Sequence, residues 1–107
     1  MTESPTTAVV RVSSGSFDPS RFAEVDVMNL RVSEYLMPAI RRLPGLIHYY
    51  TGVSAEGSVV AVSLWDSDEH AMQLSQLKEM IVDARGEAEA AGVTFTPILD
   101  YPVGWTI

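Results

Sequence analysis

The imidazoles that could move a proton near neutral pH are His48 and His70, and the chain has no cysteine. Trp65 and His70 lie five residues apart across an expected helix start. If Asp66 is the helix cap, the two rings occupy the positions of a hydrophobic staple and touch. Two interpretations stay open: a pocket wall in which His70 shuttles a proton beside an aromatic platform, or a packed staple that fixes the helix start.

A second group of polar rings lies on the expected strand 46–53. His48 shares one face of that strand with Tyr50, whereas Tyr49 shares the other face with Thr51. The face that meets the helices could use His48 or a tyrosine hydroxyl to bind an enolate or phenolate. In the alternative interpretation, His48 lies at a dimer seam and the tyrosines belong to the core.

Asn29 falls on the apolar face of the first expected helix, where a buried amide needs a protein partner or a wet pocket. Ala61 and Ser63 are small residues on the strand face of Trp65, and they leave volume for a ligand or for tight helix packing. No metal site is expected. The candidate catalytic residues are His70 and His48, and the candidate substrate-binding residues are Asn29, Tyr50, Ser63 and Trp65.

Length and composition exclude several classes of protein. A chain of 107 residues with 47% apolar residues fits one domain with a modest core, expected over 8–107 after a polar tail at 1–7. The net charge is −7 and the basic residues are scattered, which argues against nucleic acid as a partner. No apolar run reaches the roughly 18 residues of a membrane span, and no signal peptide opens the chain. We expect a cytoplasmic protein that uses no cofactor and no membrane.

Hydrophobic periodicity and capping residues predict the elements that must position these side chains. Asp18 and Pro19 open a first helix, which Pro38 should stop or kink near Met37, with a short second piece that runs to Arg41-Arg42-Leu43. Asp66 should cap a second helix that Gly92 closes. The predicted strands cover 8–12, 46–53, 59–65, 93–96 and 99–107, the last of them at an edge because it contains Pro102.

This order, β-α-β-β-α-β with an extra C-terminal strand, predicts a ferredoxin-like α+β domain: an antiparallel sheet with two helices on one face. Both faces of the strand 59–65 are apolar, so something must also cover the face without helices. A second copy of the chain would do this, and we therefore expect a homodimer through the open sheet face.

Several segments resemble the antibiotic biosynthesis monooxygenase family of the dimeric α+β barrel superfamily: Pro44-Gly45-Leu46, Tyr49-Tyr50, and the junction Leu64-Trp65-Asp66-Ser67-Asp68-Glu69. The resemblance implies a ligand pocket in each subunit between the sheet and the two helices, with Trp65 matching an aromatic residue that lines it. Two positions depart from the pattern. Ser63 stands where many relatives have an acidic residue, and Leu74-Ser75 stands where they have a histidine.

The resemblance and the residues together lead us to expect a dimer that binds a small apolar or aromatic molecule. As an enzyme it would be a cofactor-independent monooxygenase, in which His70 or His48 deprotonates a phenol or enol that then passes an electron to O2. The alternative is a non-catalytic ligand-binding or structural dimer, which the departures favour. A third interpretation is haem binding with His48 or His70 as the axial ligand.

Overall fold

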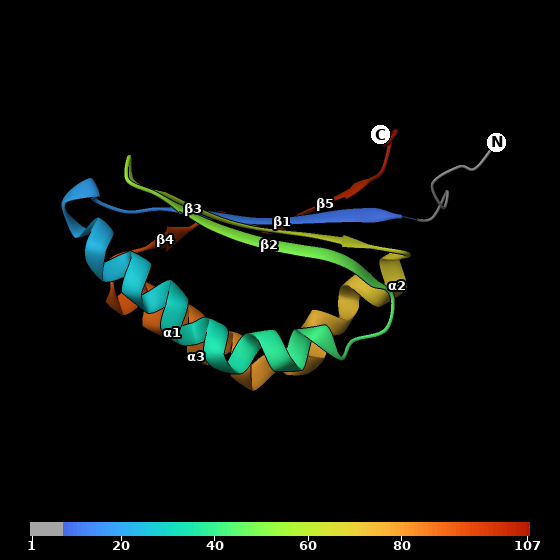
Figure 1. Cartoon of the computed structure of the whole chain (residues 1–107), viewed down its shortest axis with the longest axis horizontal. Helices are drawn as coiled ribbons and strands as arrows, with labels where there is room; N and C mark the ends of the chain where they lie inside the picture. The colour runs from blue at the N-terminus through green and yellow to red at the C-terminus, as the bar shows by residue number, and fades with distance from the viewer. Residues whose placement is uncertain (1–7) are drawn as a thin grey trace.

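The computed structural model describes the backbone of residues 8–107 and all of their side chains except those of residues 75, 76 and 78–80. The expected tail at 1–7 lies outside the described residues. Five antiparallel strands form one sheet: β1 (Val9–Ser16), β2 (Leu46–Ser54), β3 (Ser58–Trp65), β4 (Thr94–Phe95) and β5 (Leu99–Pro102). The strand order is β2-β3-β1-β4, and β5 pairs with the other end of β1 on the same side as β4 (Figure 1).

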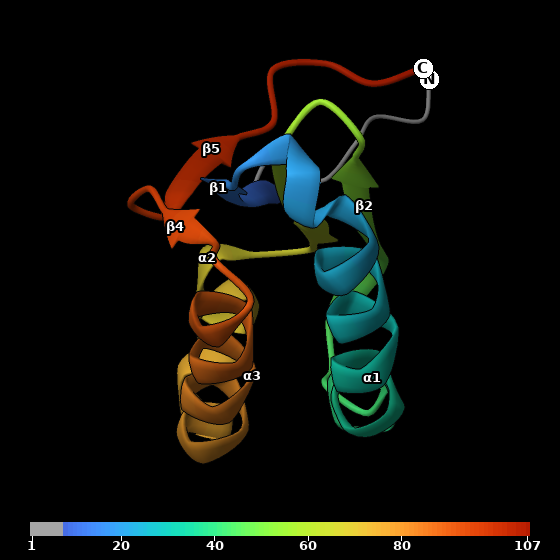
Figure 2. The ribbon, with the colours of Figure 1, turned by 90° about the vertical axis from the view of Figure 1, so that its left-hand side faces the viewer.

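The helices lie on one face of this sheet (Figure 2). They are α1 (Phe22–Arg41), α2 (Asp68–Ala71) and α3 (Lys78–Ala90), with 3-10 turns at η1 (Pro19–Arg21) and η2 (Met72–Leu77). The predicted α+β, ferredoxin-like arrangement is confirmed. Among residues 8–107, no helix has the length and apolar character that a membrane crossing needs.

The start of the first helical segment follows the prediction. The Asp18 carboxylate accepts a hydrogen bond from the backbone N–H of Ser20 at 2.9 Å, and this bond holds the pKa of Asp18 below its ordinary value. Pro19 occupies the first turn, and Phe17 is buried in the core cluster against which Phe22 packs. These residues therefore set the angle at which α1 leaves the sheet.

Of the predicted stop or kink near Met37, the stop is wrong: α1 continues through Pro38 to Arg41, over residues where a short second helical piece was expected. A proline removes one backbone hydrogen bond, and here it does so within the last turn. Ile40 lies beyond that proline and is only 3% exposed, packed in a core cluster with Val9 and Trp65. Burial of Ile40 offsets the lost bond and keeps the last turn helical.

The second helical segment starts and continues differently from the prediction. Its cap is Ser67, whose hydroxyl accepts a hydrogen bond from the backbone N–H of His70 at 3.2 Å, and not Asp66. The segment is also broken into α2, η2 and α3. Within η2, the Gln73 amide donates to the carbonyls of Pro44 at 2.7 Å and His70 at 2.8 Å, which ties this segment to the chain before β2.

The last two strands are shorter than predicted. β4 has two residues and ends before Pro97, and β5 ends at Pro102, so the expected strand to residue 107 is wrong beyond that proline. Both strands pair with β1 alone among the described strands, which leaves β5 at the predicted edge.

A polar cluster joins the two long helices. The Tyr35 hydroxyl of α1 donates to one carboxylate oxygen of Glu87 in α3 at 2.7 Å, and Arg31 donates to the other at 2.6 Å. Burial and this carboxylate raise the pKa of Tyr35 to about 12. The two hydrogen bonds lower the pKa of Glu87, so the ionised carboxylate links α1 to α3.

The register assigns every strand residue to one of two faces of the sheet. Tyr49, Ser63 and Arg11 form one row across β2, β3 and β1, and this row belongs to the face that meets the helices. No helix of the described residues covers the opposite face, whose central part is apolar, as predicted. Its apolar residues are Val10, Val12, Val60, Val62, Leu64, Leu99 and Tyr101, with His48 and Tyr50 along β2. Toward the β2–β3 turn the same face carries small and polar residues: Ser14, Ser16, Gly52, Ser54 and Ser58.

Candidate active site

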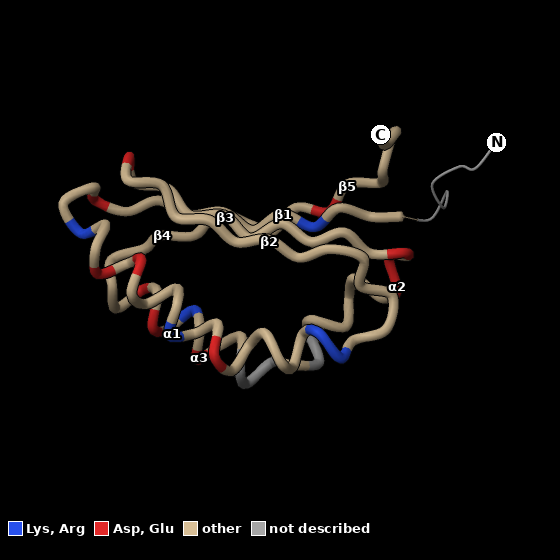
Figure 3. The backbone as a smooth tube through the Cα atoms, viewed as in Figure 1, with Lys and Arg blue, Asp and Glu red and all other residues tan. Residues whose placement is uncertain are grey.

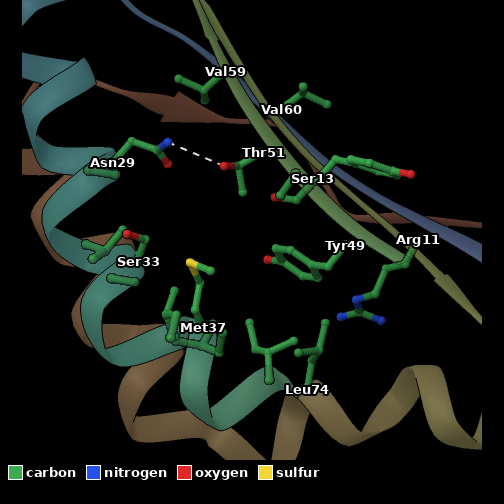
Figure 4. A pocket seen from close by; sticks show the side chains of 18 of the residues that line it. Arg11, Ser13, Asn29, Ser33, Met37, Tyr49, Thr51, Val59, Val60 and Leu74 are labelled. Atoms are coloured by element: carbon green, nitrogen blue, oxygen red, sulfur yellow. Dashed lines mark hydrogen bonds between the residues drawn. The ribbon is translucent and has the colours of Figure 1, made fainter. Parts of the chain in front are cut away.

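A pocket of about 1200 Å³ lies between the sheet and helices α1 and α3 (Figure 4). The row Ser13, Ala61 and Thr51 forms its floor, because these three residues pair across β1, β3 and β2 on the face toward the helices. All three side chains are small, which leaves space where larger residues would fill the core. Apolar residues of α1 and α3, among them Val32 and Ile81, complete most of the wall.

A few hydrogen-bonding groups interrupt this apolar wall. The Asn29 amide donates to the Thr51 hydroxyl at 3.4 Å across the pocket (Figure 4). Ser33 donates its hydroxyl proton to the carbonyl of Leu30 at 2.6 Å. Of the two possibilities for Asn29, the structure shows both at once: its amide has a protein partner and it lines the pocket.

Tyr49 and Arg11 extend into the pocket from β2 and β1 (Figure 4). Burial raises the pKa of Tyr49, and the nearby Arg11 guanidinium opposes part of this shift. Tyr49 therefore keeps its proton near neutral pH and can donate a hydrogen bond to a ligand oxygen. Arg11 forms an ion pair with Asp100 of β5, at 3.4 Å between Nη1 and Oδ1.

Trp65 and Ser63 belong to the core and do not lie among the residues that line the pocket. Trp65 is 0% exposed and its indole N–H donates to the Ser63 hydroxyl at 2.8 Å, while Ser63 is 3% exposed. The indole packs in a cluster with Val9, Ile40 and Ala71. The Ser63 hydroxyl therefore lies against Trp65 and does not line the pocket.

His70 lies at the end of α2, outside the lining of the pocket. Its Nδ1 lies 2.5 Å from Oδ1 of Asp66, and the ring packs so closely on Gly45 that a side chain there would overlap it. The structure does not bring His70 together with Asn29, Tyr50 or the pocket floor.

His48 and Tyr50 lie on the opposite face of β2 from Tyr49 and Thr51. Their rings stack with centroids 5.8 Å apart, and Tyr50 is 60% exposed. Both residues also border the pocket at the edge formed by β2. The sequence did not determine which face of β2 meets the helices. In the structure, Tyr49 and Thr51 are directed toward the helices.

Sequence reasoning missed Arg11, Ser13 and Thr51 as residues of the pocket. Thr51 could have been predicted from the length of the β2–β3 hairpin loop. Ser54 pairs with Ser58, and this pairing places Thr51 opposite Ala61. The set can bind and orient a planar molecule through apolar contact and a few hydrogen bonds. Among the side chains that the structure describes, no carboxylate lines the pocket.

No family model matches the chain, and no curated protein matches it. Solved structures match it along almost its whole length. A variant of SnoaB, a cofactor-independent oxygenase from Streptomyces nogalater, is 15% identical with a TM-score of 0.66 and coverage of 94% of this chain and 96% of that chain. A monooxygenase from the gene ActVA-Orf6 of Streptomyces coelicolor, in complex with nanaomycin D, is 18% identical with a TM-score of 0.66 and coverage of 96% and 94%.

A protein from Nitrosomonas europaea whose function is unknown matches equally well, with 8% identity, a TM-score of 0.67 and coverage of 96% of this chain and 95% of that chain. These likenesses confirm the resemblance drawn from the sequence at the level of the fold. Because the same fold also occurs in a protein of unknown function, the fold alone does not determine the activity.

Proposed function

We propose that this chain binds a planar aromatic or enolisable molecule in the pocket between sheet and helices and oxygenates it with O2 and no cofactor. The observation that carries the proposal is the pocket itself: about 1200 Å³, mostly apolar, with isolated hydrogen-bonding groups. Cavities of this kind are the usual sites for small organic ligands. The fold shared with named monooxygenases supports the reaction class.

In this proposal the substrate supplies most of the chemistry. An anthrone-like substrate loses a proton from its CH2 group, and the resulting carbanion transfers an electron to O2. The overall reaction converts CH2 and O2 into C=O and H2O. The Tyr49 hydroxyl donates a hydrogen bond to the substrate oxygen on which negative charge develops. The apolar wall keeps water from the carbanion, which favours its reaction with O2 over reprotonation.

One observation favours a second function, a ligand carrier or sensor without turnover. His70 lies outside the pocket lining, His48 borders the pocket only at its β2 edge, and no described carboxylate lines it. An oxygenase with this pocket would have to pass the substrate proton to His48 at the β2 edge or to water at the pocket mouth.

The proposal includes a homodimer through the open sheet face. Val62 and Leu64 of β3 and Tyr101 of β5 lie on that face, where none of the helices within residues 8–107 covers them. An apolar surface of this extent is unfavourable in water, and a second copy would bury it symmetrically.

The test is the oxidation of dithranol, a dihydroxyanthrone, followed by O2 consumption and by incorporation of isotopically labelled O2 into the product. The full chain should accelerate the oxidation above the protein-free rate. Ala61→Leu fills the floor of the pocket and should abolish the acceleration, whereas Ala55→Leu makes the same change in the exposed β2–β3 turn and should preserve it.

The outcomes separate the two functions. Binding of dithranol without accelerated oxidation rejects the oxygenase and leaves the carrier. If Ala61→Leu and the parent chain oxidise dithranol equally, the reaction does not occur in this pocket.

A further inference from the structure

The net charge of the pocket lining is opposite in sign to the net charge of the whole chain. The chain carries 14 acidic and 7 basic residues. Three of the basic residues, Arg11, Arg41 and Arg85, line the pocket, and no acidic residue does so among the described side chains. In Figure 3, acidic positions are spread over the helices, the β2–β3 turn and the start of α2. An excess of negative charge outside and of positive charge inside suits an anionic ligand.

Arg11 is the most deeply placed of these cations. It stands in the centre of the sheet, between Ser63 of β3 and Asp100 of β5 in the register, and its side chain is 16% exposed. It is directed into the pocket, on the same side of the sheet as Tyr49 (Figure 4). A guanidinium has five N–H donors, and the contact with Asp100 at 3.4 Å uses one of them. Its remaining donors can meet a ligand oxygen.

Arg85 of α3 is held at the other end of the pocket. Its guanidinium carbon lies 4.4 Å from the centroid of the Phe95 ring. Phe95 pairs with Gly15, four residues along β1 from Arg11, which corresponds to roughly 13 Å at about 3.3 Å per residue. The small-residue floor, with Ser13 and Ala61, lies between the two cations. A planar molecule on this floor would therefore have a guanidinium near each end.

We propose that the pocket selects planar aromatic ligands that carry an anionic oxygen, as a carboxylate or phenolate, and that Arg11 binds this oxygen while Asp100 holds the guanidinium in place. This inference rests on the proposed function in so far as the pocket takes an aromatic molecule, and it needs no turnover. Charge-assisted hydrogen bonds to a guanidinium such as that of Arg11, whose side chain is only 16% exposed, are stronger than those of neutral pairs. The Asp100 carboxylate competes with the ligand for the same positive charge.

The experiment compares two ligands of equal shape and different charge, an anthracene carboxylate and the corresponding carboxamide, by calorimetric titration of the full chain at low salt. The parent chain should bind the carboxylate about 10-fold or more tightly than the carboxamide. Arg11→Gln should remove this preference and leave the carboxamide affinity within about 3-fold, which also shows that the variant is folded.

Two further variants sharpen the result. Asp100→Asn keeps a hydrogen-bond acceptor beside Arg11 and removes the competing charge, so it should tighten carboxylate binding severalfold. Arg42→Gln removes an exposed cation after the end of α1, away from the pocket lining, and should change neither affinity.

Equal binding of the two ligands by the parent chain would overturn the inference, as would equal weakening of both by Arg11→Gln. If neither ligand binds, the inference and the proposed function fail together. A clear preference for the carboxylate without oxidation of any substrate would reject the oxygenase alone.

Discussion

Replacing Ser63 with alanine tests whether Ser63 and Trp65 serve the core or the pocket. The Ser63 hydroxyl accepts the only hydrogen bond that the structure shows from the indole N–H of Trp65, at 2.8 Å. Both residues are almost fully buried, so water cannot replace the lost acceptor. Ser63→Ala therefore leaves a buried indole N–H without a partner.

The expected cost follows from that unpaired group. A buried donor without an acceptor destabilises a protein by about 1–3 kcal/mol, and the small volume change adds little. For a domain of this size, each 1 kcal/mol lowers the melting temperature by about 4–8 °C. We expect Ser63→Ala to lower it by roughly 4–24 °C, while ligand affinity stays within about 2-fold because Ser63 does not line the pocket.

Thermal unfolding at fixed protein concentration and titration with the anthracene carboxylate measure the two quantities. Ser63→Thr keeps the hydroxyl and is the matched control. An alanine variant of unchanged stability whose ligand affinity falls 10-fold would refute this reasoning and would indicate that Ser63 binds the substrate.

Two further changes test the helix packing and the open sheet face. Because hydrogen bonds from Tyr35 and Arg31 lower the pKa of Glu87 in the folded chain, this group stabilises the fold above its usual pKa near 4.5 and loses that contribution as the pH falls through the lowered value. Glu87→Gln should thus lower the denaturation midpoint clearly at about pH 7 and little at about pH 3 in parallel unfolding curves; equal loss at both would contradict the assignment. Val62→Asp should convert a dimer to a monomer in light scattering, whereas Val27→Asp on a 58% exposed residue of α1 should not; a dimer that survives Val62→Asp would exclude the open face as the interface.

Local sequence signals were sufficient for the fold because each element has its own pattern and its own boundary residues. Asp18 and Pro19 open the first helical segment as predicted. Local sequence signals were insufficient where contacts between distant residues determine the ends of an element. Pro38 did not end α1, since Ile40 is buried against residues of β1 and β3. The break of the second helical segment involves Gln73 and the carbonyl of Pro44, 29 residues earlier, and no local pattern contains that contact.

The candidate site was predicted less well for the same reason. Asn29 was found from its place on an apolar helix face, and it does line the pocket. Shifting the cap from Asp66 to Ser67 removed Trp65 and His70 from the expected staple positions. Arg11 gave no local signal, because only the pairing of β1 with β3 and β5 shows that it stands in the centre of the sheet.

The position of β1 also has a consequence for synthesis of the protein. Of the described strands, β1 is made first, yet its partners β3, β4 and β5 are the last three to be made: Val9 pairs with Trp65 and with Pro102, about 90 residues later. At typical elongation rates of about 5–20 residues per second, the β-branched segment Val9-Val10 waits roughly 5 to 20 s for its last neighbour. During that time the sheet cannot close, so a nascent chain exposes the strand most able to pair with another molecule. Chaperone dependence should therefore be greatest before β5 leaves the ribosome.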